Sequence, residues 1–256
     1  MCMDIYKNII NEYFNDMSIT PFDINIVETT DVKSAYYKIR PDQIGKDDKS
    51  DGNYNGFCVP PKDNDGLFTI LLDKNNIDRS KENGNYNWVG TIVHETTHAD
   101  DYMKYRQLIS AQSYDELYDD NKHRMFGFWT EYHSRVMGQY YVMKNRIVNE
   151  YPFASEDYVT DTELPQLANW YFEEQEKTTD GKKLLELTST LLAMIYVWEL
   201  NYPDTFNEKN LHMLFSQAVG MEDLYSFLRE HNTIEKAVPH FDKLYQLLKI
   251  LYPEMP

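Results

Sequence analysis

Cysteine is scarce in this chain: it has two, Cys2 and Cys58, too few for a disulfide framework. That usage fits a protein of the reducing cytoplasm. A long uncharged apolar run is also missing, because the most apolar stretch, LLELTSTLLAMIYVWEL, is shorter than a membrane span and contains Glu186. The N-terminal residues carry charges throughout and have no apolar core of signal-peptide length. We therefore expect a cytoplasmic protein that does not enter a membrane.

Basic residues are outnumbered, with 25 Lys and Arg against 42 Asp and Glu, which gives a net charge of −17 at pH 7. This charge disfavours binding to nucleic acid or to an anionic membrane. It is compatible with basic peptide segments as ligands, and it also keeps a protein soluble. The 256 residues are enough for one large domain or two modest ones with a substantial core. No pattern in the sequence sets the oligomeric state.

The sequence HETTH places His94, Glu95 and His98 in the pattern HExxH. On a helix, residues four positions apart lie on one face, so both imidazoles can reach one metal ion. Two neutral histidines and a third ligand hold zinc with a position left for water, and a neighbouring carboxylate can take a proton from that water. The pattern predicts His94 and His98 as ligands and Glu95 as general base. By chance the motif is expected in about one or two per cent of such chains, and the histidines would then be ordinary polar residues.

The segments around the motif predict a small sheet beside this helix. GLFTILLD alternates over residues 66–73 and is typical of a strand, and the polar KNNIDRSKENGNYN predicts a loop in which Asn85 or Asn87 caps the helix. FDINIVE, AYYKIR and FCVPP predict further short strands. We expect an α+β fold with a small, mostly antiparallel sheet next to the HExxH helix.

Glu131 is the best candidate for the third ligand. It lies in RMFGFWTEYHSRVMGQYY, where apolar residues recur at helical spacing. Its own face carries Gly127, Ser134 and Gly138, small residues that predict the close approach of another helix. His123, His133, Asp100 and Asp101 stay as alternatives, although Asp101 is better placed to accept an imidazole N–H from His98.

A strand, a loop, an HExxH helix and a glutamate on a later helix resemble the zincin-type metallopeptidases. The likeness is to the gluzincins, and within them to the compact ImmA/IrrE-like peptidases, over roughly residues 66 to 145. The resemblance implies a zinc ion on His94, His98 and Glu131, Glu95 as general base, and a peptide or protein substrate that adds to the free edge of strand 66–73. Thermolysin-like members have an acidic residue where this chain has Arg135, and the metzincin continuation HExxHxxGxxH is absent.

Beyond Pro152 the sequence predicts a helical region, so we divide the chain into a zincin-like domain, 1–151, and a helical C-terminal region, 152–256, packing on it. The predicted helices are Leu164–Glu176, Lys182–Leu200, Glu208–Gln217, Glu222–Glu230 and Ile234–Leu251.

The expected activity is zinc-dependent hydrolysis of peptide bonds. One of Tyr132, His133, Arg135 and Tyr140 would help to stabilise the oxyanion. The alternative is a binding or regulatory protein that keeps a peptidase-like scaffold without catalysis.

Overall fold

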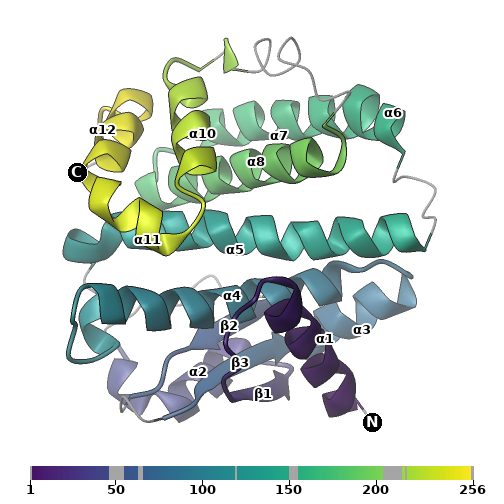
Figure 1. Ribbon diagram of the computed structural model, residues 1–256, viewed down its shortest axis with the longest axis vertical. Helices are drawn as coiled ribbons and strands as arrows, with labels where there is room; N and C mark the ends of the chain where they lie inside the picture. The colour runs from purple at the N-terminus through teal and green to yellow at the C-terminus, as the bar shows by residue number, and fades with distance from the viewer. Residues whose placement is uncertain are drawn as a thin grey trace. The chain divides into compact units, whose positions relative to one another are not determined.

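The computed structural model describes residues 2–45, 55–62, 66–118, 120–149, 155–203, 215–216 and 218–254. The chain forms two compact units, Met1–Asp119 and Asp120–Pro256 (Figure 1). The described part of the first unit contains strands and helices, and that of the second contains helices, so the predicted α+β class is confirmed. The predicted division into residues 1–151 and 152–256 stays a prediction.

The first unit is built on a three-stranded sheet with helices packed against it. Its elements are α1 (Cys2–Asp16), β1 (Ile24–Thr29), α2 (Val32–Ile39), the 3-10 turn η1 (Pro41–Gln43), β2 (Gly56–Val59), β3 (Phe68–Asp73), α3 (Lys74–Glu82), α4 (Asn87–Leu108) and the 3-10 turn η2 (Asp115–Tyr118).

The sheet is mixed, with β3 in the centre and the order β1-β3-β2. β1 runs parallel to β3, with Ile24 opposite Phe68, whereas β2 runs antiparallel, with Gly56 opposite Leu72. The expectation of a mostly antiparallel sheet is therefore wrong. The physical reason is a long connection between β1 and β3, which includes α2 and allows the two strands to run in the same direction. Since β3 is paired on both sides, the free edge expected for it is also wrong, and β1 and β2 are the outer strands.

Residues 35–40, AYYKIR, were expected to form a strand, but they belong to α2 or adjoin its end. The helix begins because the carboxylate of Asp31 accepts a hydrogen bond from the Ser34 N–H at 2.8 Å, which satisfies one of the free donors of the first turn. Val32 and Tyr36, one turn apart, are buried against Leu71 of β3. Capping and helical periodicity therefore outweigh the strand preference of the two adjacent tyrosines.

α3 replaces the first part of the loop that was expected between the strand and the HExxH helix. The side chain of Asp73, the last residue of β3, accepts a hydrogen bond from the Asn76 N–H at 2.8 Å and starts α3. Ile77 and Ser80 are buried on its inner face. α3 follows β3 directly, and only the short loop 83–86 separates α3 from α4.

α4 carries the HExxH motif, and side chains from before the helix cap its start. The N-cap residue of α4 is Tyr86, whose side chain makes no capping bond, so neither Asn85 nor Asn87 takes the N-cap position, but the Asn85 side-chain oxygen accepts a hydrogen bond from the Asn87 N–H at 3.1 Å. The Ser80 hydroxyl accepts another from the Trp88 N–H at 3.1 Å. These bonds tie the beginning of α4 to α3.

The two faces of β2 contact different helices, because successive strand residues point to opposite sides. Phe57 packs with the cluster of Val32 and Tyr36 from α2. Gly56 and Cys58 lie on the other face, toward Glu95 of α4. The sheet is thus enclosed between α2 and α4, which fixes Glu95 against β2.

The second unit is helical throughout its described part. Its elements are α5 (Asp120–Val148), α6 (Glu156–Tyr158), the π turn η3 (Val159–Glu163), α7 (Leu164–Lys177), α8 (Gly181–Asn201), α10 (Met221–Glu230), α11 (Ile234–Ala237), the 3-10 turn η4 (Val238–His240) and α12 (Phe241–Leu251). α8 packs against both α5 and α7, as Figure 1 shows, and the predicted central burial of its apolar residues is confirmed.

The helices of this unit match the predicted ranges in part. The continuous helix expected over 234–251 is wrong, because the 3-10 turn Val238–His240 interrupts it where Pro239 cannot donate a backbone hydrogen bond. The helix expected over 208–217 lies, except for 215 and 216, outside the described residues. The predicted helices in 164–176, 182–200 and 222–230 are confirmed by α7, α8 and α10.

Candidate metal centre

His94 and His98 lie on one face of α4, as their spacing predicts. Their Nε2 atoms are 3.1 Å apart, with ring centroids at 4.7 Å and ring planes at 85°. Two nitrogens bound tetrahedrally to one zinc ion at about 2.0–2.1 Å would stand about 3.3 Å from each other. The pair therefore fits the ligand geometry of a single ion. Without an ion, the same contact allows one neutral ring to donate its Nε2–H to the other.

Glu95 lies beside this pair. One carboxylate oxygen is 4.0 Å from the Nε2 of His94, and the residue is 7% exposed. It is held between α4 and β2, where Gly56 leaves room for its side chain. A carboxylate so close to an imidazole nitrogen is within reach of water that shares the same space. The first unit thus brings together three of the four predicted site residues, His94, Glu95 and His98.

Cys58 of β2 is buried and lies near the carboxylates of Glu95 and Asp101. Burial raises the pKa of the Cys58 thiol well above its usual value, and the negative charges of Glu95 and Asp101 raise it further. The thiol is therefore kept protonated and is a poor metal ligand in this state. Asp101 is 1% exposed; its predicted hydrogen bond from His98 stays a prediction.

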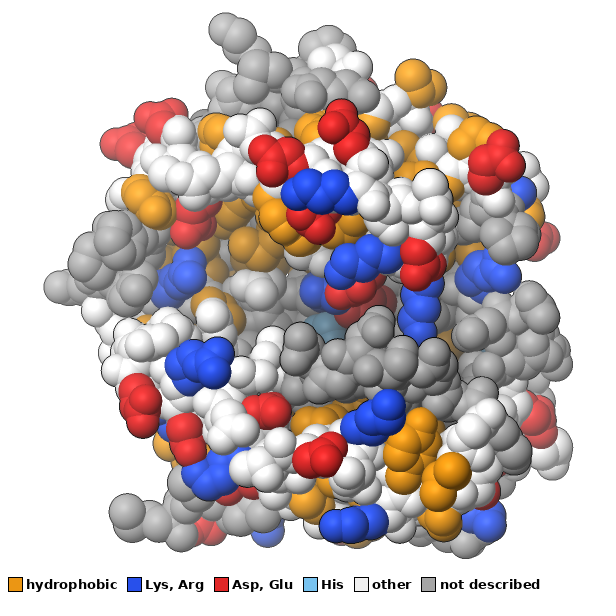
Figure 2. Space-filling model, turned by 180° about the vertical axis from the view of Figure 1, so that it is seen from behind, with side chains coloured by type: hydrophobic (Ala, Val, Ile, Leu, Met, Phe, Trp, Pro, Cys, Tyr) orange, Lys and Arg blue, Asp and Glu red, His pale blue; other side chains and the backbone are white. Residues whose placement is uncertain are grey.

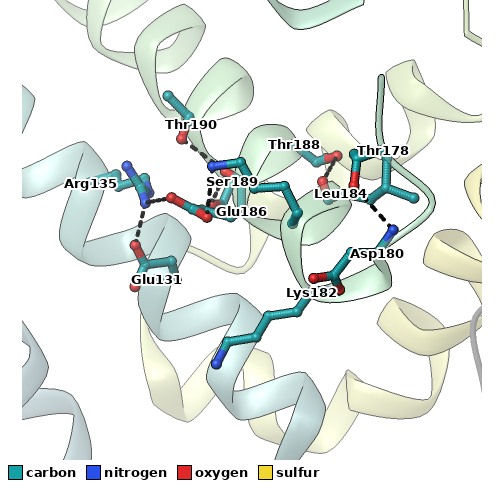
Figure 3. A network of polar contacts seen from close by, with 11 residues as sticks. Glu131, Arg135, Thr178, Asp180, Lys182, Leu184, Glu186, Thr188, Ser189 and Thr190 are labelled. Carbon is teal, nitrogen blue, oxygen red and sulfur yellow. Dashed lines mark hydrogen bonds and ion pairs between the residues drawn. The ribbon is translucent and has the colours of Figure 1, made fainter. Parts of the chain in front are cut away.

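Glu131 lies on α5, in the second unit, with its side chain 31% exposed. Arg135, one turn later, places its guanidinium 2.7 Å from the Glu131 carboxylate. The same guanidinium is 3.6 Å from the carboxylate of Glu186 on α8, so it bridges two helices (Figure 3). An anchored carboxylate loses less conformational freedom when it binds a cation, but Arg135 also competes for its oxygens. That Glu131 is the third ligand stays a prediction. The close approach of another helix to the face of Gly127, Ser134 and Gly138 also stays a prediction. At Gly127 itself, an added Cβ would meet nothing within 4 Å.

The alternative third ligands are placed as follows. His123 is 5% exposed and sits at a kink of α5, with φ −117° and ψ 16°. His133 stacks on Trp129 with centroids 4.8 Å apart. Asp100 forms an ion pair with Lys104 at 2.7 Å.

Among the candidates for stabilising an oxyanion, Tyr132 is fully buried. Burial raises the pKa of its hydroxyl well above the usual value, and the nearby charged or ionisable groups belong to Tyr196, Arg229 and Glu199 of the same unit. A hydroxyl enclosed in this interior is poorly placed to touch a substrate. Arg135 is committed to Glu131 and Glu186, so it could act on an oxyanion only after releasing one of them.

A cavity of about 270 Å³ lies at the start of α4. Its wall is mostly polar and uncharged, with Asn55, Asn76, Ile77, Arg79, Ser80, Asn83, Asn85, Asn87, Trp88 and Thr91. No carboxylate belongs to the part of this wall that the structure describes, although the chain is strongly acidic. Thr91, which belongs to this wall, is one turn before Glu95 on α4.

Sequence reasoning missed Gly56, Cys58 and Glu186 as neighbours of the predicted site residues. Their proximity depends on which strand packs on α4 and which helix packs on α5, and neither local pattern nor spacing encodes that pairing. The polar lining of the cavity was also missed, although its many asparagines are visible in the segment 75–87.

Comparisons with family models, with curated proteins and with solved structures found no match for this chain. Within the described residues, every helix is too short or too polar to cross a membrane. On the face shown in Figure 2, acidic and basic side chains lie next to one another among the described residues.

Proposed function

We propose that this chain is a zinc-dependent metallopeptidase in which His94, His98 and Glu131 hold the ion and Glu95 is the general base. The observation that carries the proposal is the arrangement on α4, two imidazole nitrogens 3.1 Å apart with a buried carboxylate 4.0 Å from one of them. A purely structural metal site has no need of a carboxylate between its histidines. The donor set of two imidazoles and one carboxylate is one that zinc accepts in catalytic sites.

When bound, zinc supplies Lewis acidity that polarises a carbonyl group and makes water more acidic. The chain's own residues do the rest. Glu95 accepts the proton of the attacking water and returns it to the leaving amine. Its burial against β2 keeps bulk solvent away and strengthens its electrostatic interaction with the reacting atoms. His94 and His98 would hold the ion through ring nitrogens, and each imidazole must be neutral to do so.

Substitution of the general base tests the proposal directly. We expect Glu95→Gln to bind as much zinc as the natural chain and to lose at least about 10²-fold in turnover, because the amide cannot accept the proton. Cleavage of a peptide library, read by mass spectrometry with and without chelator, measures turnover, and metal analysis measures zinc. Glu82→Gln, an exposed position on α3, is the matched control and should change neither.

The cleavage and zinc measurements together distinguish the metallopeptidase from the alternative. Unchanged cleavage by the Glu95→Gln variant contradicts the role of Glu95. Zinc bound by the natural chain without any chelator-sensitive cleavage favours a binding or regulatory protein on a peptidase-like scaffold. A chain that binds no zinc rejects the metallopeptidase.

A further inference from the structure

Gly56 lies where β2 meets the proposed general base. It is the first residue of β2, it is buried, and it pairs with Leu72 of β3. A Cβ at this position would stand 2.9 Å from the Cγ of Glu95 and 3.1 Å from its Oε1. It would also stand 2.8 Å from the Cγ2 of Thr91. Carbon atoms at such distances overlap, so the side chains would have to move.

The lack of room for a Cβ, and not the backbone conformation, explains why residue 56 is a glycine. Its φ is outside the left-handed region, so any residue could adopt its backbone conformation. Glycine in a strand weakens the strand, and it commonly marks a place where another group approaches closely. Here the approaching group is the side chain of Glu95, which uses the place that a Cβ would take.

From this contact we infer that Gly56 is a positioning residue, whose missing side chain sets how far the Glu95 carboxylate reaches toward the reacting atoms. The inference rests on the proposed function and adds a requirement to it. Glu95 has three rotatable bonds, and α4 alone fixes only their starting point. The backbone of β2 at Gly56 packs against one side of the Glu95 side chain. A methyl group at Gly56 would therefore push the Cγ of Glu95, and the carboxylate with it, away from its position.

Gly56→Ala tests the inference. We expect kcat to fall about 10²-fold, because a misplacement of about 1 Å at a reacting group has this effect. KM and zinc content should stay within about twofold of the natural values, since the three atoms nearest to the added Cβ belong to Thr91 and Glu95 and not to a proposed zinc ligand. Gly181→Ala, where an added Cβ meets nothing within 4 Å, is the matched control and should leave every quantity unchanged.

A second substitution separates the two contacts of the added methyl group. Thr91→Ser removes the Cγ2 atom and leaves only the contact with Glu95. On its own this change should have little effect, and in the double variant Gly56→Ala/Thr91→Ser the low kcat should persist. Recovery of kcat in the double variant would place the cause at Thr91 and overturn the inference, as would a kcat for Gly56→Ala within about twofold of the natural chain.

Two further measurements keep the inference open to refutation if Gly56→Ala folds poorly or if the natural chain proves inactive. Glu95→Asp leaves Gly56 unchanged and withdraws the carboxylate by one methylene, so full kcat with aspartate would show that reach is unimportant. A crystal structure of Gly56→Ala should show the Glu95 carboxylate displaced while β2 and α4 stay in place. An undisplaced carboxylate overturns the inference whatever the activity, whereas absence of cleavage by the natural chain rejects the proposed function alone.

Discussion

At the scale of single residues, Arg40 is a buried cation of the first unit, with 1% of its side chain exposed. Its guanidinium contacts Asp42 at 3.0 Å and Asp115 at 2.6 Å, so it links the end of α2 to η2 across 75 residues of chain. A buried charge is tolerated only when such partners replace water. The hydrogen bonds from Arg40 hold the pKa of the Asp42 carboxyl well below its ordinary value of 3.8.

Asp42→Asn should make the stability of the first unit depend less on pH. A carboxyl whose pKa is lowered by folding stabilises the folded state above about pH 4, and this contribution is lost as the pH falls through the lowered pKa. We expect the variant to lose about 1 kcal/mol of unfolding free energy at pH 7, a modest value because the carboxylate is 27% exposed. Urea unfolding at several pH values measures the difference, which should shrink below pH 4.

Asp78→Asn is the control for this prediction, since Asp78 forms an exposed ion pair with Lys74 on α3. Pairs of that kind contribute little, and we expect less than about 0.5 kcal/mol at any pH. Equal losses in both variants, or a loss for Asp42→Asn that does not vary with pH, would contradict the role given to Arg40.

At the scale of elements, the approach of α12 to the start of α10 depends on Gly220. This residue is the N-cap of α10 and has φ +87°, a conformation that favours glycine. A Cβ there would stand 2.8 Å from the Cγ2 of Ile250 on α12. Backbone conformation and close packing therefore both require glycine at this point.

Gly220→Ala should lower the unfolding free energy by about 2 kcal/mol, of which about 1 kcal/mol comes from the left-handed backbone and the rest from the contact with Ile250. In an Ile250→Ala background, where the contacting atom is gone, the cost of the glycine substitution should fall to about 1 kcal/mol. Thermal and urea unfolding of the four proteins give both values. Equal costs in the two backgrounds would mean that the contact with Ile250 contributes nothing.

The elements also show why some structure could be predicted from the sequence and some could not. The HExxH face, the central burial of α8 and strand β3 follow from local periodicity, which sequence reports directly. α2 was mistaken for a strand because its tyrosines favour strands, and the capping signal of Asp31 was overlooked. Pairing of β1 with β3, and the contact of Gly56 with Glu95, join residues far apart in the chain, which no local pattern encodes.

At the scale of the whole molecule, the proposed ligands come from both units, His94 and His98 from the first and Glu131 from the second. If one ion holds all three, zinc must stabilise both units together, because binding to the folded state alone raises the unfolding free energy. At a free zinc concentration about 100 times Kd, this effect is about 2.7 kcal/mol.

We therefore expect zinc to slow amide hydrogen exchange both in α4 and in α5, and chelator to reverse it. Glu131→Ala should weaken zinc binding by at least about tenfold. In this variant zinc should no longer slow amide exchange in α5, whereas it should still slow exchange in α4 to a smaller extent. Glu163→Ala, a carboxylate elsewhere in the second unit, is the control. Protection confined to α4 in the natural chain would remove Glu131 from the ligand set.

The shortness of β2 limits what a bound peptide can gain from main-chain pairing. In the described segment 55–62 the strand runs from Gly56 to Val59, and Pro60 and Pro61 follow it. At about 3.3 Å per residue, such an edge aligns little more than a tetrapeptide, and a proline cannot donate a further bond. If the proposed peptidase binds its substrate along this edge, residues 55–62 offer a longer peptide few further main-chain hydrogen bonds, and selectivity among peptides would come from side chains.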